Sequence, residues 1–268
     1  MAWPTESFDL TCGTTGAAHE ISIGLPVREA QLTEAPLLFT LDGPWMFGTV
    51  LDATRIMSMS NEAPEAIVVG LSFADRSMGE YLRQRARWYT PTPWVPPPVT
   101  GVRGLEADQA GRAAELLAFI EDQAIPAVLD RLPDSLGVSE RWLVGHSFSA
   151  LFGLTALFRG CTTFDRWLLA SPSIWWDGRS VLDVEAEYAA SNTDLGTTIF
   201  TCYGREELDD KDDYFRMGQN VEELLATLGG RGYPGLSITR EVIERTGHAS
   251  SVGGAISAGL RALHQPPA

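Results

Sequence analysis

Residues 142–149, WLVGHSFS, place a serine in a short polar turn between an apolar run and a second apolar segment that resumes at helical spacing. The pattern predicts a strand, a sharp turn and a helix, with the hydroxyl of Ser147 lifted out of the sheet. The backbone N–H of Phe148 would begin the helix and point at an oxyanion formed beside that hydroxyl. We therefore predict that Ser147 is a nucleophile and that Phe148 supplies one oxyanion donor.

The turn departs at one position from the pattern G-x-S-x-G, because Ser149 stands where the second glycine is expected. That glycine leaves room for the helix to pack close to the strand, and serine is the next smallest polar residue. A pattern this short also arises by chance in many chains. The prediction for Ser147 therefore depends on finding a base and an acid elsewhere in the sequence.

His248 is the histidine best placed to be the base. It lies in residues 246–250, TGHAS, directly after the last predicted strand, whereas His146 is inside the serine turn. His19 and His264 lie in an N-terminal hairpin and in the C-terminal segment. A base that follows nucleophile and acid in the chain matches the order of strand–turn–helix serine sites. The alternative for His248 is an ordinary surface loop histidine.

The acid should follow the strand before the one that leads to His248, where residues 204–209 read GREELD. A carboxylate there would hold the imidazole in one tautomer and stabilise the imidazolium. Glu207 is preferred and Glu206 is second, because both lie near the strand end, with Asp209 a further alternative. Asp177, after the preceding strand, is the candidate outside this turn.

The second oxyanion donor should come from the loop after the strand at residues 36–41. Pro44 has no N–H, so Gly43 or Trp45 must supply it. Gly43 is preferred because its backbone can approach a ligand closely. A tight turn that needs glycine is compatible with the same residue type.

Strands and helices alternate along most of the chain, which predicts an α/β fold with a mostly parallel central sheet and helices on both faces. Alternating residues at 8–12 and 21–27 predict an antiparallel pair at one edge. Further strands are expected at 36–41, 66–73, 142–144, 167–171, 198–203 and 236–243, and helices at 51–59, 108–132, 150–158, 214–228 and 251–263.

Residues 83–107 are predicted to form a long loop that lines the substrate pocket or covers it. The 83–100 part, RQRARWYTPTPWVPPPVT, is rich in arginine, aromatic residues and proline, and it is too apolar for a solvated linker. We expect the strand at 66–73 to neighbour the nucleophile strand, which would bring this loop over Ser147. The pocket walls are predicted to include Trp45, Tyr89, Trp175 and Trp176.

Composition limits the class of protein. The 268 residues suit one α/β domain, residues 1–268, and the net charge of −15 disfavours nucleic acid and anionic membranes as partners. Three widely spaced cysteines indicate neither a disulfide framework nor a zinc site. The first residues lack a signal-peptide pattern, and no apolar run approaches a membrane span. We expect a cytoplasmic protein without cofactor or metal, acting on a small-molecule ester.

Several motifs together resemble the putative-esterase family of α/β hydrolases, which includes enterochelin-type esterases and esterase D. They are LDGPWMFG at 41–48, IVVGLSF at 67–73, WYTPTP at 88–93, LVGHSFSALFGL at 143–154, LASPSIWWD at 169–177 and GHASS at 247–251. The resemblance spans nearly the whole chain. It implies the α/β-hydrolase fold, Ser147 as nucleophile, His248 as base and an acid in the 204–209 turn.

These residues favour a metal-independent serine esterase that forms an acyl-enzyme. Acyl transfer to an alcohol on the same machinery is the second hypothesis, and a non-catalytic binding domain is the third. The family name suggests a siderophore ester as substrate. A ferric tricatecholate is strongly anionic, however, and a chain of net charge −15 would repel it unless Arg83, Arg85 or Arg87 lines the site.

Overall fold

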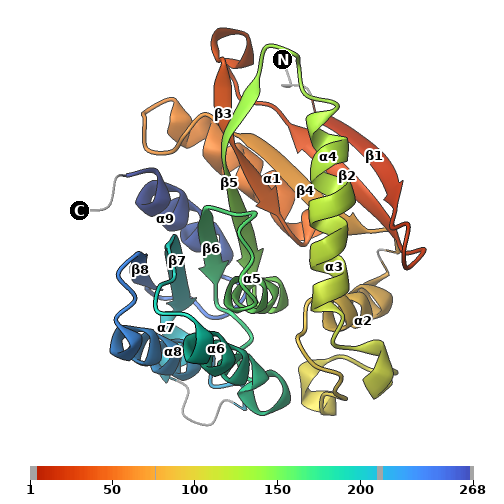
Figure 1. Ribbon diagram of the computed structural model, residues 1–268, viewed down its shortest axis with the longest axis vertical. Helices are drawn as coiled ribbons and strands as arrows, with labels where there is room; N and C mark the ends of the chain where they lie inside the picture. The colour runs from red at the N-terminus through yellow and green to blue at the C-terminus, as the bar shows by residue number, and fades with distance from the viewer. Residues whose placement is uncertain (1–4, 76, 210–213, 266–268) are drawn as a thin grey trace.

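An eight-stranded sheet forms the centre of the computed structural model, which describes residues 5–75, 77–209 and 214–265 (Figure 1). The strand order is β1-β2-β4-β3-β5-β6-β7-β8. β1 pairs antiparallel with β2 and β2 antiparallel with β4, whereas every later pair is parallel. The strands are β1 Thr5–Thr11, β2 Ala18–Gly24, β3 Glu34–Thr40, β4 Ile67–Phe73, β5 Gly137–His146, β6 Arg166–Ala170, β7 Thr197–Gly204 and β8 Leu236–Ile243.

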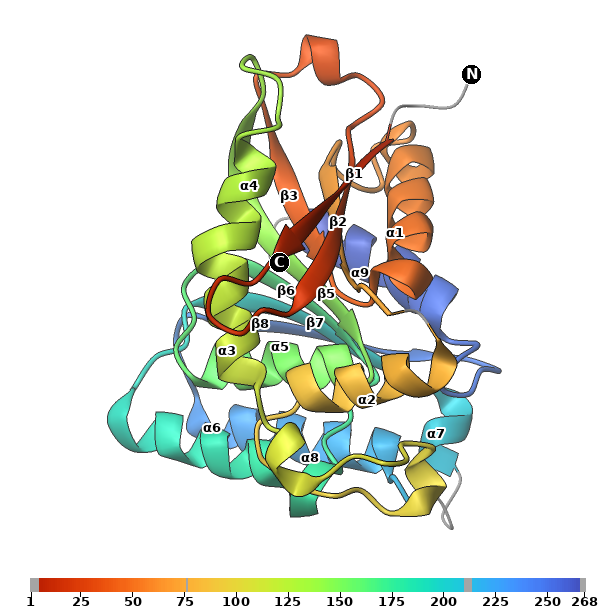
Figure 2. The same ribbon diagram turned by 90° about the vertical axis from the view of Figure 1, so that its right-hand side faces the viewer.

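Helices cover both faces of this sheet (Figure 2). α1 (Gly43–Ser58) and α9 (Val252–His264) pack together on one face. The other face carries α3 (Ala113–Phe119), α5 (Phe148–Phe158) and α8 (Met217–Arg231), while α2 (Met78–Trp88) and α6 (Ser180–Ser191) pack against α5. The α/β class and the antiparallel N-terminal edge predicted from the sequence are confirmed.

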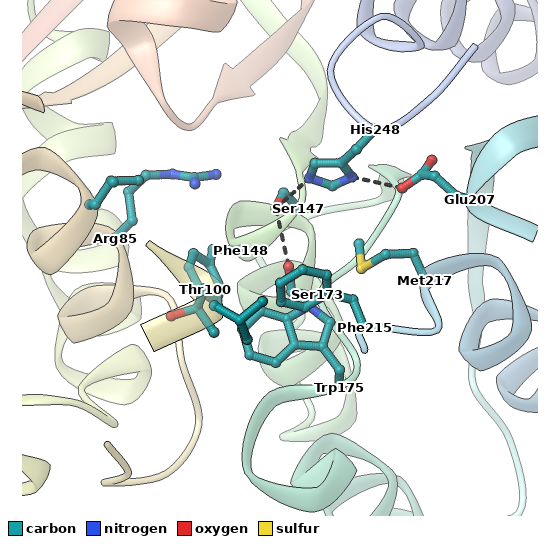
Figure 3. A pocket seen from close by; sticks show the side chains of 12 residues that line it. Arg85, Thr100, Ser147, Phe148, Ser173, Trp175, Glu207, Phe215, Met217 and His248 are labelled. Atoms are coloured by element: carbon teal, nitrogen blue, oxygen red, sulfur yellow. Dashed lines mark hydrogen bonds and ion pairs between the residues drawn. The ribbon is translucent and has the colours of Figure 1, made fainter. Parts of the chain in front are cut away.

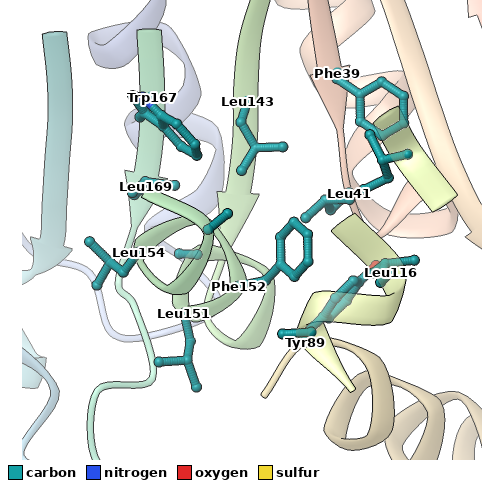
Figure 4. Close-up of a cluster of buried hydrophobic side chains, with 14 of the residues drawn as sticks. Phe39, Leu41, Tyr89, Leu116, Leu143, Leu151, Phe152, Leu154, Trp167 and Leu169 are labelled. Carbon is teal, nitrogen blue, oxygen red and sulfur yellow. The ribbon is translucent and has the colours of Figure 1, made fainter. Parts of the chain in front are cut away.

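Two clusters of buried apolar side chains hold the helices to the sheet. The larger contains Leu143 and Leu169 of the strands together with Leu151 and Phe152 of α5 (Figure 4). The smaller joins α1 and α9 to the opposite face of the same strands, where Val144 and Leu168 point. Because both faces are covered, the central strands are apolar at nearly every position, as in β4, where all residues are buried.

Three sequence predictions were wrong. β4 does not neighbour the nucleophile strand, because β3 lies between β4 and β5. The predicted loop at 83–107 begins too early, since residues 83–88 are the end of α2. The predicted helix at 108–132 is shorter and is interrupted by the π-helical turn Ile120–Ala124, after which α4 (Ile125–Leu129) follows.

Three helices were absent from the sequence prediction, and the first of them is α2, whose end lies in the predicted loop. α6 follows the β6 loop, and the short α7 (Arg205–Asp209) occupies the turn that was expected to carry the acid. Within the described ranges, no helix has both the length and the apolar character needed to cross a membrane.

Candidate active site

The turn between β5 and α5 holds Ser147 in an unusual backbone conformation, with φ 65° and ψ −118°. Non-glycine residues rarely adopt such angles, and they do so where the surrounding structure enforces them. Glycine at position 145 allows this tight turn, because a Cβ added there would lie 2.6 Å from the backbone C and O atoms of Ser149. Strand and helix therefore cross too closely for a side chain at position 145.

Ser149 replaces the second glycine of the pattern without opening this turn. Its side chain is fully buried, and its Oγ accepts a hydrogen bond from the backbone N–H of His146 at 2.8 Å. The same Oγ donates to the carbonyl of His146, also at 2.8 Å. The departure from glycine thus supplies two contacts inside the elbow.

Three predicted side chains meet at the carboxyl edge of the sheet (Figure 3). The Ser147 Oγ lies 3.0 Å from the Nε2 of His248, and the Nδ1 of His248 lies 2.7 Å from the Oε1 of Glu207. The three residues follow β5, β8 and β7 respectively, so parallel strands bring their ends to one place. The arrangement can move a proton from the serine hydroxyl to the imidazole while the carboxylate stabilises the imidazolium.

Glu207 is the buried member of its acidic turn, whereas Glu206 and Asp209 are exposed. Its Oε2 accepts hydrogen bonds from the Ser171 hydroxyl at 2.8 Å and from the Gly204 N–H at 2.6 Å. Burial raises the pKa of the Glu207 carboxyl, but the bonds and charge of His248 and these donors outweigh burial and hold that pKa below its usual value. The carboxylate is therefore ionised and fixed in orientation.

His146 holds the loop that carries His248. Its Nε2 lies 3.0 Å from the backbone carbonyl of His248, and the two rings are 4.5 Å apart between centroids. Burial, followed by the nearby charges of His248 and Arg85, lowers the pKa of His146 to about 3. A neutral His146 donates one N–H, and that N–H goes to the carbonyl.

Ser173 places a further hydroxyl beside Ser147, and the sequence analysis did not single it out. Its Oγ lies 3.1 Å from the Ser147 Oγ, and its backbone N–H donates to the Ser147 carbonyl at 3.1 Å. The Nδ1–H of His248 is directed at Glu207, so the Nε2 of His248 is an acceptor. It accepts the hydrogen bond that the Ser147 hydroxyl donates with its only proton. Ser173 must then donate to the Ser147 Oγ. Its position just after β6, at the edge where the other site residues lie, is the signal that could have identified it.

A buried ion pair adjoins the site. Asp42, at the turn between β3 and α1, accepts from Arg85 of α2 through both carboxylate oxygens, at 2.8 and 2.9 Å. Arg85 also donates to the carbonyl of His146 at 3.3 Å, and the hydroxyl of Tyr81 donates to Asp42 at 3.2 Å. One guanidinium thus connects the turn before Gly43 to the turn that carries Ser147.

Two cavities open beside Ser147. The first, of about 380 Å³, is lined mainly by apolar side chains of α2, α5 and the segments near residues 99, 175 and 215. The second, of about 370 Å³, lies toward α1 and α9 and is lined by Trp45, Met46 and Val252 among others. Both cavities share Ser147, His248 and Arg85. A substrate can therefore extend to both sides of the serine hydroxyl.

The predicted pocket walls are divided between the cavities and the core. Trp175 lines the first cavity and Trp45 the second. The prediction was wrong for Tyr89 and Trp176, which are fully buried and line neither cavity. The hydroxyl of Tyr89 accepts from the N–H of Asp42, and Trp176 packs behind the wall against Phe148. An aromatic residue near a site in sequence gives no information about which side of the wall it occupies.

The two predicted oxyanion donors lie at the first positions of helices. Phe148 begins α5 and Gly43 begins α1, and the first N–H groups of a helix have no partner within that helix. Packing alone already requires glycine at position 43, because an added Cβ would lie 2.2 Å from the Ser72 Oγ and 3.0 Å from the Leu71 carbonyl oxygen. The donor role of both residues stays a prediction.

Of the three arginines considered for the site, Arg85 lines both cavities. Arg83 instead forms an ion pair with Glu80 at 2.7 Å and is not among the residues that line either cavity. Arg87 is likewise absent from both linings.

Comparison with known proteins identifies relatives along nearly the whole chain. A siderophore enterobactin esterase of Emericella nidulans is 27% identical over 94% of this chain and 91% of its own length. A siderophore triacetylfusarinine C esterase of Aspergillus fumigatus is 30% identical over 55% of this chain and 47% of its own. Among solved structures, the siderophore hydrolase EstB from Aspergillus nidulans superposes with a TM-score of 0.80 and 26% identity, covering 96% of this chain and 93% of the other.

The model of the family described as "Putative esterase" matches residues 13–227, which is most of the chain. The sequence resemblance to this family is therefore confirmed, and so is the α/β-hydrolase fold that it implied. The chain belongs to the putative esterase family and is a carboxylic-ester hydrolase.

Proposed function

We propose that this protein hydrolyses small carboxylic esters of the siderophore type through an acyl-enzyme on Ser147. The observation that supports the proposal most strongly is the hydrogen-bonded series Ser147, His248, Glu207, which lies between two cavities large enough for the two halves of an ester. The names of the relatives, which include siderophore esterases from two fungi, support this type of substrate.

The first half of the reaction forms the acyl-enzyme. The Ser147 Oγ attacks the ester carbonyl carbon while its proton passes to the Nε2 of His248, and Glu207 stabilises the imidazolium. The backbone N–H groups of Phe148 and Gly43 would hold the oxyanion. When the tetrahedral intermediate collapses, His248 gives its proton to the departing alkoxide, and the alcohol leaves.

The second half returns the enzyme to its starting state. Water enters, His248 takes one of its protons, and the hydroxide attacks the acyl carbon. Collapse releases the carboxylic acid, and His248 returns a proton to the Ser147 Oγ. An alcohol in place of water would give acyl transfer instead, so product analysis with added alcohol separates hydrolysis from transfer.

The test removes the nucleophile. Ser147→Ala should reduce hydrolysis of nitrophenyl acetate to the uncatalysed rate, with an unchanged melting temperature. A fluorophosphonate should add one adduct to the wild type, and peptide mass spectrometry should place it on Ser147. The matched control is Ser180→Ala, which removes another buried hydroxyl, one that contacts Thr92 rather than the site. Wild-type turnover by Ser147→Ala would refute the mechanism.

We also propose that the reaction takes place in the cytoplasm. All three cysteines are free thiols, and Cys12 and Cys202 are buried. Unpaired cysteines are typical of a reducing compartment. Fractionation of the source cells with an antibody against this chain would test the assignment.

A further inference from the structure

The ionised side chains that line the two cavities compensate one another. Arg85 is the cation of both linings within the described ranges, and both carboxylate oxygens of Asp42 hold it at 2.8 and 2.9 Å. Glu207 lines the first cavity, and its charge is directed to the imidazole of His248. No cation with uncompensated charge therefore faces a ligand in the described linings.

The net charge of the whole chain further disfavours an anionic ligand. With 35 acidic and 20 basic residues, the protein carries a net charge of −15. Summed surface charge sets the potential at a cleft, and a negative potential lowers the local concentration of anions. An anionic ligand meets this potential, and the described residues of the two linings offer it no free cation.

The cavity walls favour uncharged groups by burial. The first cavity is lined by Leu82, Val99, Phe148, Trp175, Phe215 and Met217, and the second by Trp45, Met46, Ala249 and Val252. Thr100 also lines the first cavity, in addition to the polar residues already described. Removing apolar surface from water stabilises a complex by about 25 cal/mol per Å². A charged group placed against the same walls loses its hydration without gaining a partner.

We propose that the site selects esters that carry no net negative charge. The inference rests on the proposed function, and it divides siderophore-type esters into two chemical classes. Three catecholate groups bring six negative charges to Fe³⁺ and leave the complex at −3, whereas three hydroxamate groups bring three charges and leave it neutral. The neutral ferric trihydroxamate ester is the class that this site fits.

A matched pair of model esters isolates charge from size. The nitrophenyl monoester of glutaric acid and the nitrophenyl ester of glutaramic acid have the same length and differ only in a terminal carboxylate or amide. At low ionic strength we expect kcat/KM to be roughly tenfold higher for the amide, since the electrostatic energy of one added charge in a partly solvated site changes binding by about that factor. The ratio should shrink in 1 M salt, where the screening length is about 3 Å.

A positive charge introduced at the rim of the first cavity should narrow the preference for the amide ester. Val99 lines the first cavity, is 59% exposed and is not in the core, so Val99→Arg adds a cation without removing a buried contact. We expect Val99→Arg, compared with Val99→Gln, to raise the ratio of kcat/KM for the carboxylate ester to kcat/KM for the amide ester several-fold at low salt. Val99→Gln is the control for side-chain size.

The ferric complexes extend the test to the substrate class. Wild-type protein should cleave a neutral ferric trihydroxamate ester faster than a ferric tricatecholate trilactone. Equal rates within each pair of esters, or a preference that neither salt nor Val99→Arg alters, would overturn the charge proposal and leave the esterase intact. No hydrolysis of any ester by correctly folded protein would instead overturn the proposed function.

Discussion

At the scale of single residues, the hydrogen bonds around the Ser147 hydroxyl assign a donor role to Ser173. The Ser147 Oγ gives its proton toward His248 and accepts one from Ser173 at 3.1 Å. That bond holds the Oγ in the rotamer that faces the imidazole. Ser173 touches the nucleophile and is therefore expected to influence how reactive the nucleophile is.

Ser173→Ala should lower kcat/KM for model esters by about tenfold, which is the value of one hydrogen bond of 1–1.5 kcal/mol. The rate of Ser147 labelling by a fluorophosphonate should fall by a similar factor, because labelling reports on the nucleophile alone. The melting temperature should change as little as in Ser180→Ala. Unchanged labelling would show that the Ser173 bond does not orient Ser147.

The acidic turn gives a second residue-scale prediction. Glu207→Gln should lower kcat by about 10³ to 10⁴, because loss of the carboxylate disturbs the histidine tautomer and leaves the imidazolium unpaired. Glu206→Gln, next to it and exposed, is the matched control and should retain nearly full activity. If both variants are equally active, the bond between Glu207 and His248 has no role in the reaction.

At the scale of elements, the Arg85–Asp42 pair connects α2 to the turn between β3 and α1. Burial lowers the pKa of Arg85, but the adjacent Asp42 outweighs burial and raises it, so the guanidinium stays charged. Removing one partner of a buried pair leaves the other charge uncompensated. Stability and site geometry therefore depend on both residues together.

Arg85→Met should lower the free energy of unfolding by about 3–5 kcal/mol in urea titrations. The double variant Arg85→Met with Asp42→Asn should recover a large part of that loss, because neither charge of the pair then remains buried. Arg112→Ala, which breaks an exposed pair with Glu115 at 3.4 Å, is the control and should cost about 0–1 kcal/mol. A single variant as mild as this control would show that the site tolerates an unpaired Asp42.

The sequence predicted the elements with clear periodicity and turn chemistry, and it missed those where composition gave a misleading signal. Residues 83–88 are rich in arginine and precede a proline-rich segment, which favoured a loop. The first proline of that segment is Pro91, and it restricts Thr90 rather than α2. Arg85 faces inward to Asp42, so a charged residue occupies the buried face and obscures the amphipathic pattern.

The same contrast holds for the site. Chain order, together with strand ends at a common edge, was sufficient to predict that Ser147, His248 and an acid of the 204–209 turn lie together, with Glu207 preferred and Glu206, Asp209 and Asp177 left open. The burial of Tyr89 and Trp176 could not be predicted, because sequence spacing does not tell whether a ring faces a cavity or the core. The order of the strands in the sheet could not be predicted either, since β3 pairs with both β4 and β5 across large separations in sequence.

At the scale of the whole molecule, two buried neutral histidines make the free energy of unfolding decrease as the pH falls. Burial lowers the pKa of His19 to about 4, and burial with nearby charges lowers that of His146 to about 3. Unfolded histidine binds a proton near pH 6.5, so the unfolded chain takes up protons first as the pH falls. The stability contributed by neutral burial is complete above pH 6.5 and declines as the pH falls toward 4.

Each such histidine should steepen the loss of stability by about 1.4 kcal/mol per pH unit between roughly pH 6 and pH 4. His19→Phe should flatten the dependence, because the His19 ring is stacked on Phe119 at 4.5 Å and phenylalanine can take its place without titrating. Urea midpoints measured at several pH values provide the check. Identical slopes for His19→Phe and wild type would contradict a neutral buried His19.

The strand order also has a consequence for biosynthesis. Ser147 follows β5, Glu207 follows β7 and His248 follows β8, so the ribosome makes the proposed nucleophile first and the proposed base last. A nascent chain that ends before residue 248 contains Ser147 but lacks His248, the base of the proposed mechanism. Under the proposed mechanism, a molecule gains hydrolytic activity only after β8 and the loop that carries His248 have been made.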